Sequence, residues 1–119
     1  MNFDLSEEQQ LVSDSIERFV QENYNLDSRI AIVKKSPGYS EEYWKTMSEL
    51  GWLGLPFAQD DGGFGGNQLD TMILMEHFGK GLVLEPFLAS IVLGGGVLKR
   101  TGNEAQRKQW LESVIDGSK

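Results

Sequence analysis

The chain has 119 residues, which fits one domain with a single core of ordinary size. It contains no cysteine, which excludes disulfide bonds, thiolate metal sites and a cysteine nucleophile. Its net charge of −7 would repel phosphate backbones, so we expect no nucleic-acid partner.

The first residues lack the basic and then apolar pattern of a secretory signal. The longest apolar runs are interrupted by glycine and are too short to span a membrane. We therefore expect no membrane span and a cytoplasmic protein.

Helical periodicity dominates the sequence, and it predicts an all-α fold, a bundle of about five to six helices in which residues 1–119 form a single domain. Ser6 and Gln9 form a capping-box pattern that begins a helix at Glu7 and predicts its end near Asn23. The inner face of this helix is expected to carry Val12, Ile16, Phe19 and Val20.

Residues 25–36 are ambiguous, because a short helix could form before the Ser-Pro-Gly sequence that ends it. Ser40 has the character of a second N-cap, and Gly51 stands where a left-handed residue would end that helix. The predicted inner stripe of this helix consists of Tyr43, Trp44, Met47 and Leu50.

Residues 52–56 are apolar but contain glycine and proline, so we expect a buried connector, followed by a loop over 57–66. A helix over 67–78 is apolar nearly all round, which predicts an interior position. The Gly79-Lys80-Gly81 sequence is expected to stop it.

Pro86 suits the first position of a further central helix, which is predicted over 86–98 and ends before Gly102. Asn103 and Gln106 form another capping box. The final helix is expected to end at Gly117, with one apolar face formed by Trp110, Leu111, Val114 and Ile115.

Two glycine-rich segments could suggest ligand binding. Residues 62–66 lack the spacing of a dinucleotide or phosphate loop, so we favour a backbone turn. Three consecutive glycines at 94–96 are costly within a helix, and we favour a helix break or close packing over room for a ligand.

The side chains suggest no complete active site. His77 is the only histidine, so no zinc motif is present, and we expect a structural or exposed role for it. Glu76 is expected to pair with Lys80 at i,i+4 spacing. We predict no catalytic residue and no metal ligand in this chain.

Four ordered motifs resemble the acyl-CoA dehydrogenase family over essentially the whole chain. They are the opening Phe3-Asp4-Leu5-Ser6-Glu7-Glu8-Gln9, the Glu49-Leu50-Gly51-Trp52-Leu53-Gly54-Leu55-Pro56 segment, the glycine loop at 62–66, and Gly102-Asn103-Glu104-Ala105-Gln106 leading to Trp110-Leu111. Ala58-Gln59 stands where the family usually has Pro-Glu, which leaves the subfamily open. Residues 82–88 with the three glycines are similar to bacterial members that act on dicarboxylic or steroid-derived acyl groups.

The resemblance implies the N-terminal helical domain of an FAD-dependent enzyme that converts an acyl-CoA to a 2-enoyl-CoA. The β-domain and the C-terminal helical domain would be absent from this chain, and with them the glutamate base and the flavin contacts. We therefore expect no cofactor on this chain alone, which would be inactive by itself. The parent enzyme is expected to be a homo- or hetero-oligomer that passes electrons to an electron-transfer flavoprotein.

The resemblance also implies that the helix over 86–98 forms part of the acyl-pocket wall. The matching positions are Pro86, Ala89, Ser90, Leu93 and Gly94. Two alternatives stay open: a stand-alone helical interaction module, including a non-catalytic subunit, and a related oxidase that shares the fold.

Overall fold

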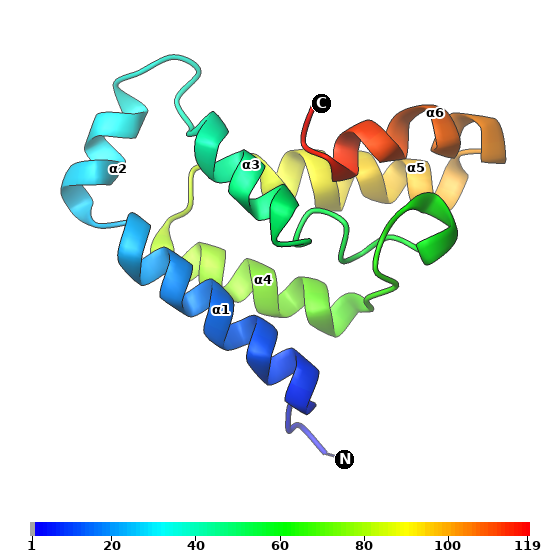
Figure 1. The fold of residues 1–119 in the computed structure, drawn as a ribbon, viewed down its shortest axis with the longest axis horizontal. Coiled ribbons are helices and arrows are strands. Elements are labelled where there is room, and N and C mark those ends of the chain that lie inside the picture. Colours follow the sequence, from blue (N-terminus) through cyan, green and yellow to red (C-terminus); the bar gives the residue numbers. More distant parts are fainter. Residues whose placement is uncertain (1) are drawn as a thin grey trace.

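The structure is a computed structural model, and it describes residues 2–119. Within these residues no strand is present. The elements follow in the order α1 (Glu7–Asn23), α2 (Leu26–Val33), α3 (Glu41–Glu49), η1 (Gln59–Asp61), α4 (Gln68–Gly81), η2 (Leu88–Gly95), α5 (Gly96–Thr101) and α6 (Glu104–Ile115). The expected all-α architecture is confirmed (Figure 1).

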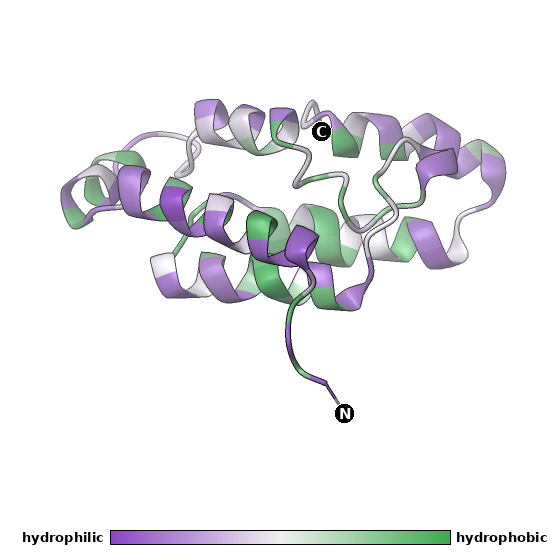
Figure 2. Ribbon diagram, turned by 60° about the horizontal axis from the view of Figure 1, so that its bottom comes forward, coloured by the Kyte–Doolittle hydropathy of each residue, from purple (hydrophilic) through white to green (hydrophobic). Residues whose placement is uncertain are grey.

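The molecule is flat, with principal extents of 43 × 40 × 20 Å, so it is about two helix diameters thick. Helix α1 packs along α4, and α6 packs against η2 and α5. Figure 2 shows this thin arrangement from a lower angle. In such a slab the outer faces of the helices stay exposed, and some of the exposed side chains are large and apolar.

The helix starts follow the predicted capping chemistry. Ser6 and Gln9 exchange both hydrogen bonds of a capping box, and so do Asn103 and Gln106. Ser40 accepts from the Tyr43 backbone N–H at 3.2 Å. Because these bonds are local, they fix the first turns of α1, α3 and α6 independently of the tertiary packing.

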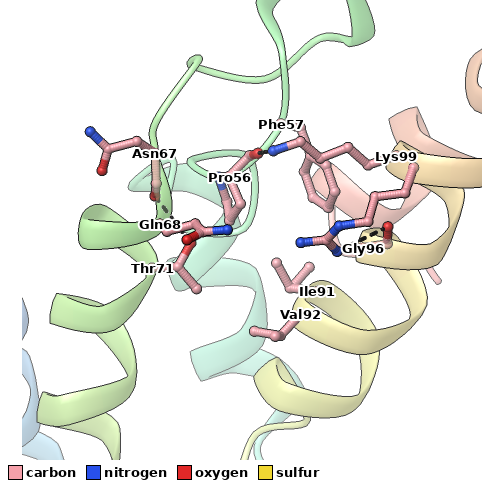
Figure 3. A pocket seen from close by; sticks show the side chains of 10 residues that line it. Pro56, Phe57, Asn67, Gln68, Thr71, Ile91, Val92, Gly96 and Lys99 are labelled. Atoms are coloured by element: carbon pink, nitrogen blue, oxygen red, sulfur yellow. Dashed lines mark hydrogen bonds between the residues drawn. The ribbon is translucent and has the colours of Figure 1, made fainter.

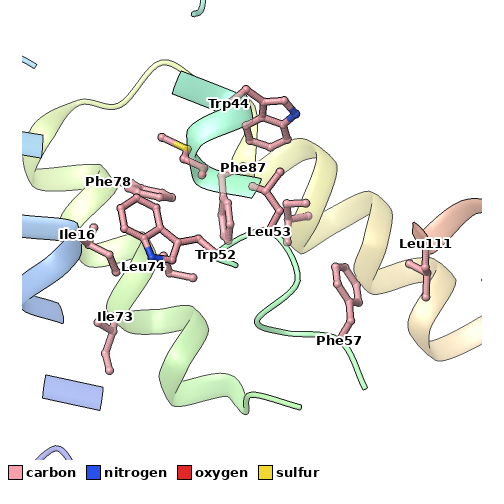
Figure 4. Close-up of a cluster of buried hydrophobic side chains, with 12 residues drawn as sticks. Ile16, Trp44, Trp52, Leu53, Phe57, Ile73, Leu74, Phe78, Phe87 and Leu111 are labelled. Carbon is pink, nitrogen blue, oxygen red and sulfur yellow. The ribbon is translucent and has the colours of Figure 1, made fainter. Parts of the chain in front are cut away.

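An aromatic chain runs through the core and joins four segments, and Figure 4 shows its rings Trp52, Phe78 and Phe87. Phe19 of α1 contacts Trp52 of the connector at 5.4 Å between ring centroids, and Trp52 contacts Phe78 of α4 at 6.1 Å. Phe78 in turn meets Phe87, which lies just before η2, at 5.2 Å. The prediction that residues 52–56 form a buried connector is confirmed, since Trp52 and Leu53 lie in the core.

Three expectations about the core are wrong. Leu50 and Trp110 are 49% and 40% exposed, and Leu50 is the C-cap residue that follows α3. Helix α4 is not fully interior: Met72 is 53% exposed on its outer side. In a slab this thin, even a helix that is apolar nearly all round keeps one outer face exposed to solvent.

Helix α4 also ends later than expected. Gly79 and Lys80 stay helical, and the left-handed residue is Leu82, with φ of 51°. A Cβ on Gly81 would lie 2.2 Å from Cγ1 of Val20, so this glycine allows the close approach of α1 and does not end the helix.

Candidate functional site

The predicted pocket-wall positions lie on or next to one helical segment, η2. Ala89, Leu93 and Gly94 are exposed, and Leu93 keeps 59% of its surface. Leu88 and Val97 are also large exposed apolar residues of this segment and of α5, at 51% and 61%. The segment therefore presents an outer face that is apolar and contains the small residues Ala89 and Gly94. We call this set of five residues the outer η2 face.

Pro86 and Ser90 are half-buried and line a cavity of about 450 Å³ beside this face. The cavity lies between α3, the start of η2 and the last residues of the chain. Its other lining residues are Tyr39, Glu41, Trp44, Lys45, Asp116, Gly117, Ser118 and Lys119. The structure thus divides the five predicted residues into two at this cavity and three on the outer η2 face.

The three consecutive glycines do not break the helix. Residues 88–95 form a wide π-helical segment that continues into α5 without interruption and ends at Thr101, directly before Gly102 as predicted. Gly95 is buried, and a Cβ there would lie 2.3 Å from Cζ of Phe57, so close packing explains it. Gly94 differs, because its Cβ would meet only the Ala89 carbonyl oxygen of the same segment, at 3.3 Å.

The glycine loop at 62–66 is a backbone turn, as predicted. The Phe64 N–H donates to the Gly54 oxygen at 3.0 Å, and the Gly65 and Gly66 N–H groups donate to Phe57 and Leu55 oxygens at 2.7 Å each. A Cβ on Gly63 would lie 2.3 Å from the Phe57 oxygen. The loop's N–H groups are therefore occupied by its own chain, and they form no cradle for a phosphate.

A second cavity, of about 160 Å³, lies between α4 and the η2–α5 segment (Figure 3). Phe57, Ile91 and Val92 contribute apolar surface to it, and Lys99 and Arg100 contribute the charges. Both cations already donate to backbone oxygens, Lys99 to Pro56 at 2.7 Å and Arg100 to Gly96 at 3.3 Å. None of the five predicted pocket residues lines this cavity.

Glu85 is the buried charged residue of the described chain, with 5% of its surface exposed. Its Oε2 accepts from the Ser40 backbone N–H at 3.2 Å, and its Oε1 has no hydrogen-bond partner in the protein. Burial raises the pKa of the Glu85 carboxyl to about 7, and the Ser40 hydrogen bond opposes this only in part. Glu85 is the only charged residue in the apolar sequence 82–88, which could have indicated a buried carboxyl. This residue was not singled out from the sequence.

The remaining polar side chains have structural contacts. His77 lies 2.8 Å through Nε2 from the Ser13 hydroxyl and so joins α4 to α1, as a structural role requires. Lys80 and Glu76 form the predicted ion pair at 2.7 Å. Within residues 2–119, no group of three acidic or histidine side chains could hold a metal ion, and no helix is long and apolar enough to cross a membrane.

The chain is similar to known proteins in sequence and in fold. A Bacillus subtilis protein named "Probable acyl-CoA dehydrogenase YngJ" is 29% identical in sequence. The aligned region covers 99% of this chain and 31% of that protein. The mitochondrial isovaleryl-CoA dehydrogenase of Pongo abelii is 32% identical over 95% of this chain, and 27% of that protein is covered. The chain thus spans less than a third of the length of these relatives.

Among solved structures, the ChsE4–ChsE5 complex from Mycobacterium tuberculosis matches 98% of this chain with a TM-score of 0.89 at 24% identity, which covers 32% of that chain and indicates a shared fold. PigA, solved with FAD and proline, matches 99% with a TM-score of 0.80 at 28% identity, covering 31% of its chain. The family model described as "Acyl-CoA dehydrogenase, N-terminal domain" matches residues 6–118. This chain therefore belongs to the family of acyl-CoA dehydrogenase N-terminal domains.

Proposed function

We propose that this chain is the N-terminal domain of an FAD-dependent acyl-CoA dehydrogenase and that its outer η2 face forms part of the acyl-pocket wall. The observation that carries the proposal is this exposed apolar face in a chain of this family. Large apolar residues clustered on the surface commonly mark a binding site or an interface. The parent enzyme would convert an acyl-CoA to a 2-enoyl-CoA.

The composition of the face suggests how it would act. Leu88, Leu93 and Val97 offer apolar surface to an acyl group, whereas Ala89 and Gly94 keep the space beside the helix open. A side chain at position 94 would project outward, since only the helix's own backbone lies near it. Position 94 is therefore the place where side-chain size would change the width of the pocket.

The residues of this chain do not fit an FAD site by themselves. The N–H groups of the glycine loop donate to backbone oxygens of residues 54–59, so they are not free to bind the phosphates of the flavin cofactor. In the proposed parent, the flavin and the catalytic base would be held by the β-domain and the C-terminal domain. We further propose an oligomeric parent that acts on acyl-CoA and passes electrons to an electron-transfer flavoprotein.

The substitution Gly94→Leu in the full-length enzyme tests the pocket wall. We expect kcat/KM for long or bulky acyl-CoAs to fall at least tenfold relative to short ones, a change of about 1.4 kcal/mol in selectivity. Gly79→Leu is the matched control, because this exposed position in α4 has nothing within 4 Å of an added Cβ and lies outside the outer η2 face. Unchanged selectivity in Gly94→Leu would contradict the proposal.

The intact mass of the natural gene product separates this proposal from a stand-alone helical module. A mass about three times that of this 13.3 kDa chain is expected, because the relatives are that much longer. A natural product consisting of these 119 residues would favour the stand-alone module instead.

A further inference from the structure

The Glu85 carboxyl lies where three segments meet. The residue lies in the connection from α4 to η2. Its Oε2 accepts from the N–H of Ser40, the N-cap residue of α3, and its backbone oxygen accepts from the Phe87 N–H at 2.8 Å. Phe87 is 1% exposed and belongs to the aromatic chain of the core. The side chain of Glu85 thus contacts the start of α3, while its backbone is bonded to Phe87 directly before η2.

We propose that Glu85 is a positioning residue of the acyl-pocket wall, whose neutral carboxyl holds the start of η2 against α3 and whose ionisation loosens this contact. The buried oxygen without a partner is the physical reason. A carboxylate there would be desolvated with only one hydrogen bond to compensate it, and it could regain water only by moving outward. Such movement would displace Pro86 and the first residues of η2.

The surrounding titratable groups do not neutralise that charge. Glu41 and Glu42 follow Ser40 and are exposed, as are Lys34 and Lys35 of the preceding loop. Tyr24 near the end of α1 has a buried hydroxyl without a partner and contacts Tyr43 of α3, while Arg29 donates to the Leu82 oxygen at 2.9 Å. None of these groups makes an ion pair with Glu85, and the raised pKa of Glu85 has no charged neighbour among its causes.

The consequence for the pocket rests on the proposed function, because only as a pocket wall does the position of η2 matter for substrate. Near neutral pH the carboxyl would be divided between its two forms, so the wall would be fixed at lower pH and looser at higher pH. Pro86 and Ser90, which line the cavity beside α3, are the residues that such a change would move first.

The test is a ¹³C-detected NMR titration of this chain, the Glu85→Gln variant and the Glu41→Gln variant between about pH 5 and pH 9, a range that contains the raised pKa. The Glu85 carboxyl carbon is expected to titrate with a midpoint near 7. The backbone carbons of Ser40 and of residues 87–90 should shift with the same midpoint. Both responses should persist in Glu41→Gln, whereas the backbone response should vanish in Glu85→Gln.

Two results would overturn the proposal. The Glu85 carboxyl could titrate near its ordinary value of 4.5, or it could titrate near 7 while residues 87–90 stay unchanged. Neither result depends on enzymatic activity. A negative titration result would therefore contradict the role of Glu85 without affecting the pocket-wall proposal. A negative result with Gly94→Leu would contradict the pocket wall without affecting the contact between η2 and α3.

Discussion

The substitution Gly95→Ala tests whether the glycines of η2 serve packing. An added Cβ at position 95 would lie 2.3 Å from Cζ and 2.9 Å from Cε1 of Phe57. The Phe57 ring is 1% exposed and packed in the core, and one side of it lines the cavity of about 160 Å³ between α4 and the η2–α5 segment. We therefore expect the η2 backbone or the ring to shift, at a cost in the free energy of unfolding.

The size of this cost follows from two opposing effects. Overpacking against a buried ring costs about 3 kcal/mol at the upper end of the usual range. Replacing a helical glycine by alanine returns about 1 kcal/mol. The net destabilisation should thus be about 2 kcal/mol. Gly94→Ala is the matched control: its Cβ would meet only the Ala89 oxygen at 3.3 Å, so it should be neutral or slightly stabilising.

Urea unfolding followed by circular dichroism measures both variants, provided that the m-values stay equal. The double substitution of Phe57→Leu with Gly95→Ala should recover part of the loss, because the shorter side chain removes the ring carbons in question. Equal stability of Gly95→Ala and Gly94→Ala, within about 0.5 kcal/mol, would refute the packing explanation.

Three further predictions concern stability and cofactor binding. The folded-state pKa of Glu85 of about 7 lies above the ordinary 4.5, so the folded state holds the proton more tightly and wild-type stability should fall as pH rises between these values. The stability of Glu85→Gln relative to wild type should therefore grow by about 3 kcal/mol from pH 4.5 to pH 8, measured by urea unfolding; parallel pH profiles would count against this. Ser13→Ala removes the partner of His77 and should cost about 1 kcal/mol, whereas Asp14→Ala, at an exposed hydrogen bond on the same helix, should change little; equal effects would argue against the Ser13–His77 contact. The purified chain should bind no FAD in an absorbance titration, because its glycine loop bonds to its own backbone; stoichiometric binding would contradict that assignment.

Local chemistry was predictable from sequence where it depends on neighbouring residues. The capping boxes at Ser6 and Asn103 and the positive φ of Gly51 depend on contacts within a few residues, and all three are present. The end of α4 was not predictable in this way. Gly81 faces Val20, which is far away in sequence, so its role appears only when α1 and α4 are packed together.

In the candidate site, too, the local features were predictable from sequence and the features that depend on tertiary packing were not. The sequence predicted a helix at 86–98 and its small residues, but it could not separate Gly94, which is open, from Gly95, which packs on Phe57. That difference depends on which side of the helix the Phe57 ring packs against. The burial of Glu85 depends likewise on Ser40, which approaches from another helix.

A structure of the full-length enzyme with FAD and a bound acyl-CoA tests the central claim most directly. The acyl group is expected to lie in van der Waals contact with Ala89, Leu93 and Gly94, so that the outer η2 face is covered by substrate. An acyl group bound elsewhere, with these three residues covered only by protein or left in solvent, would contradict it.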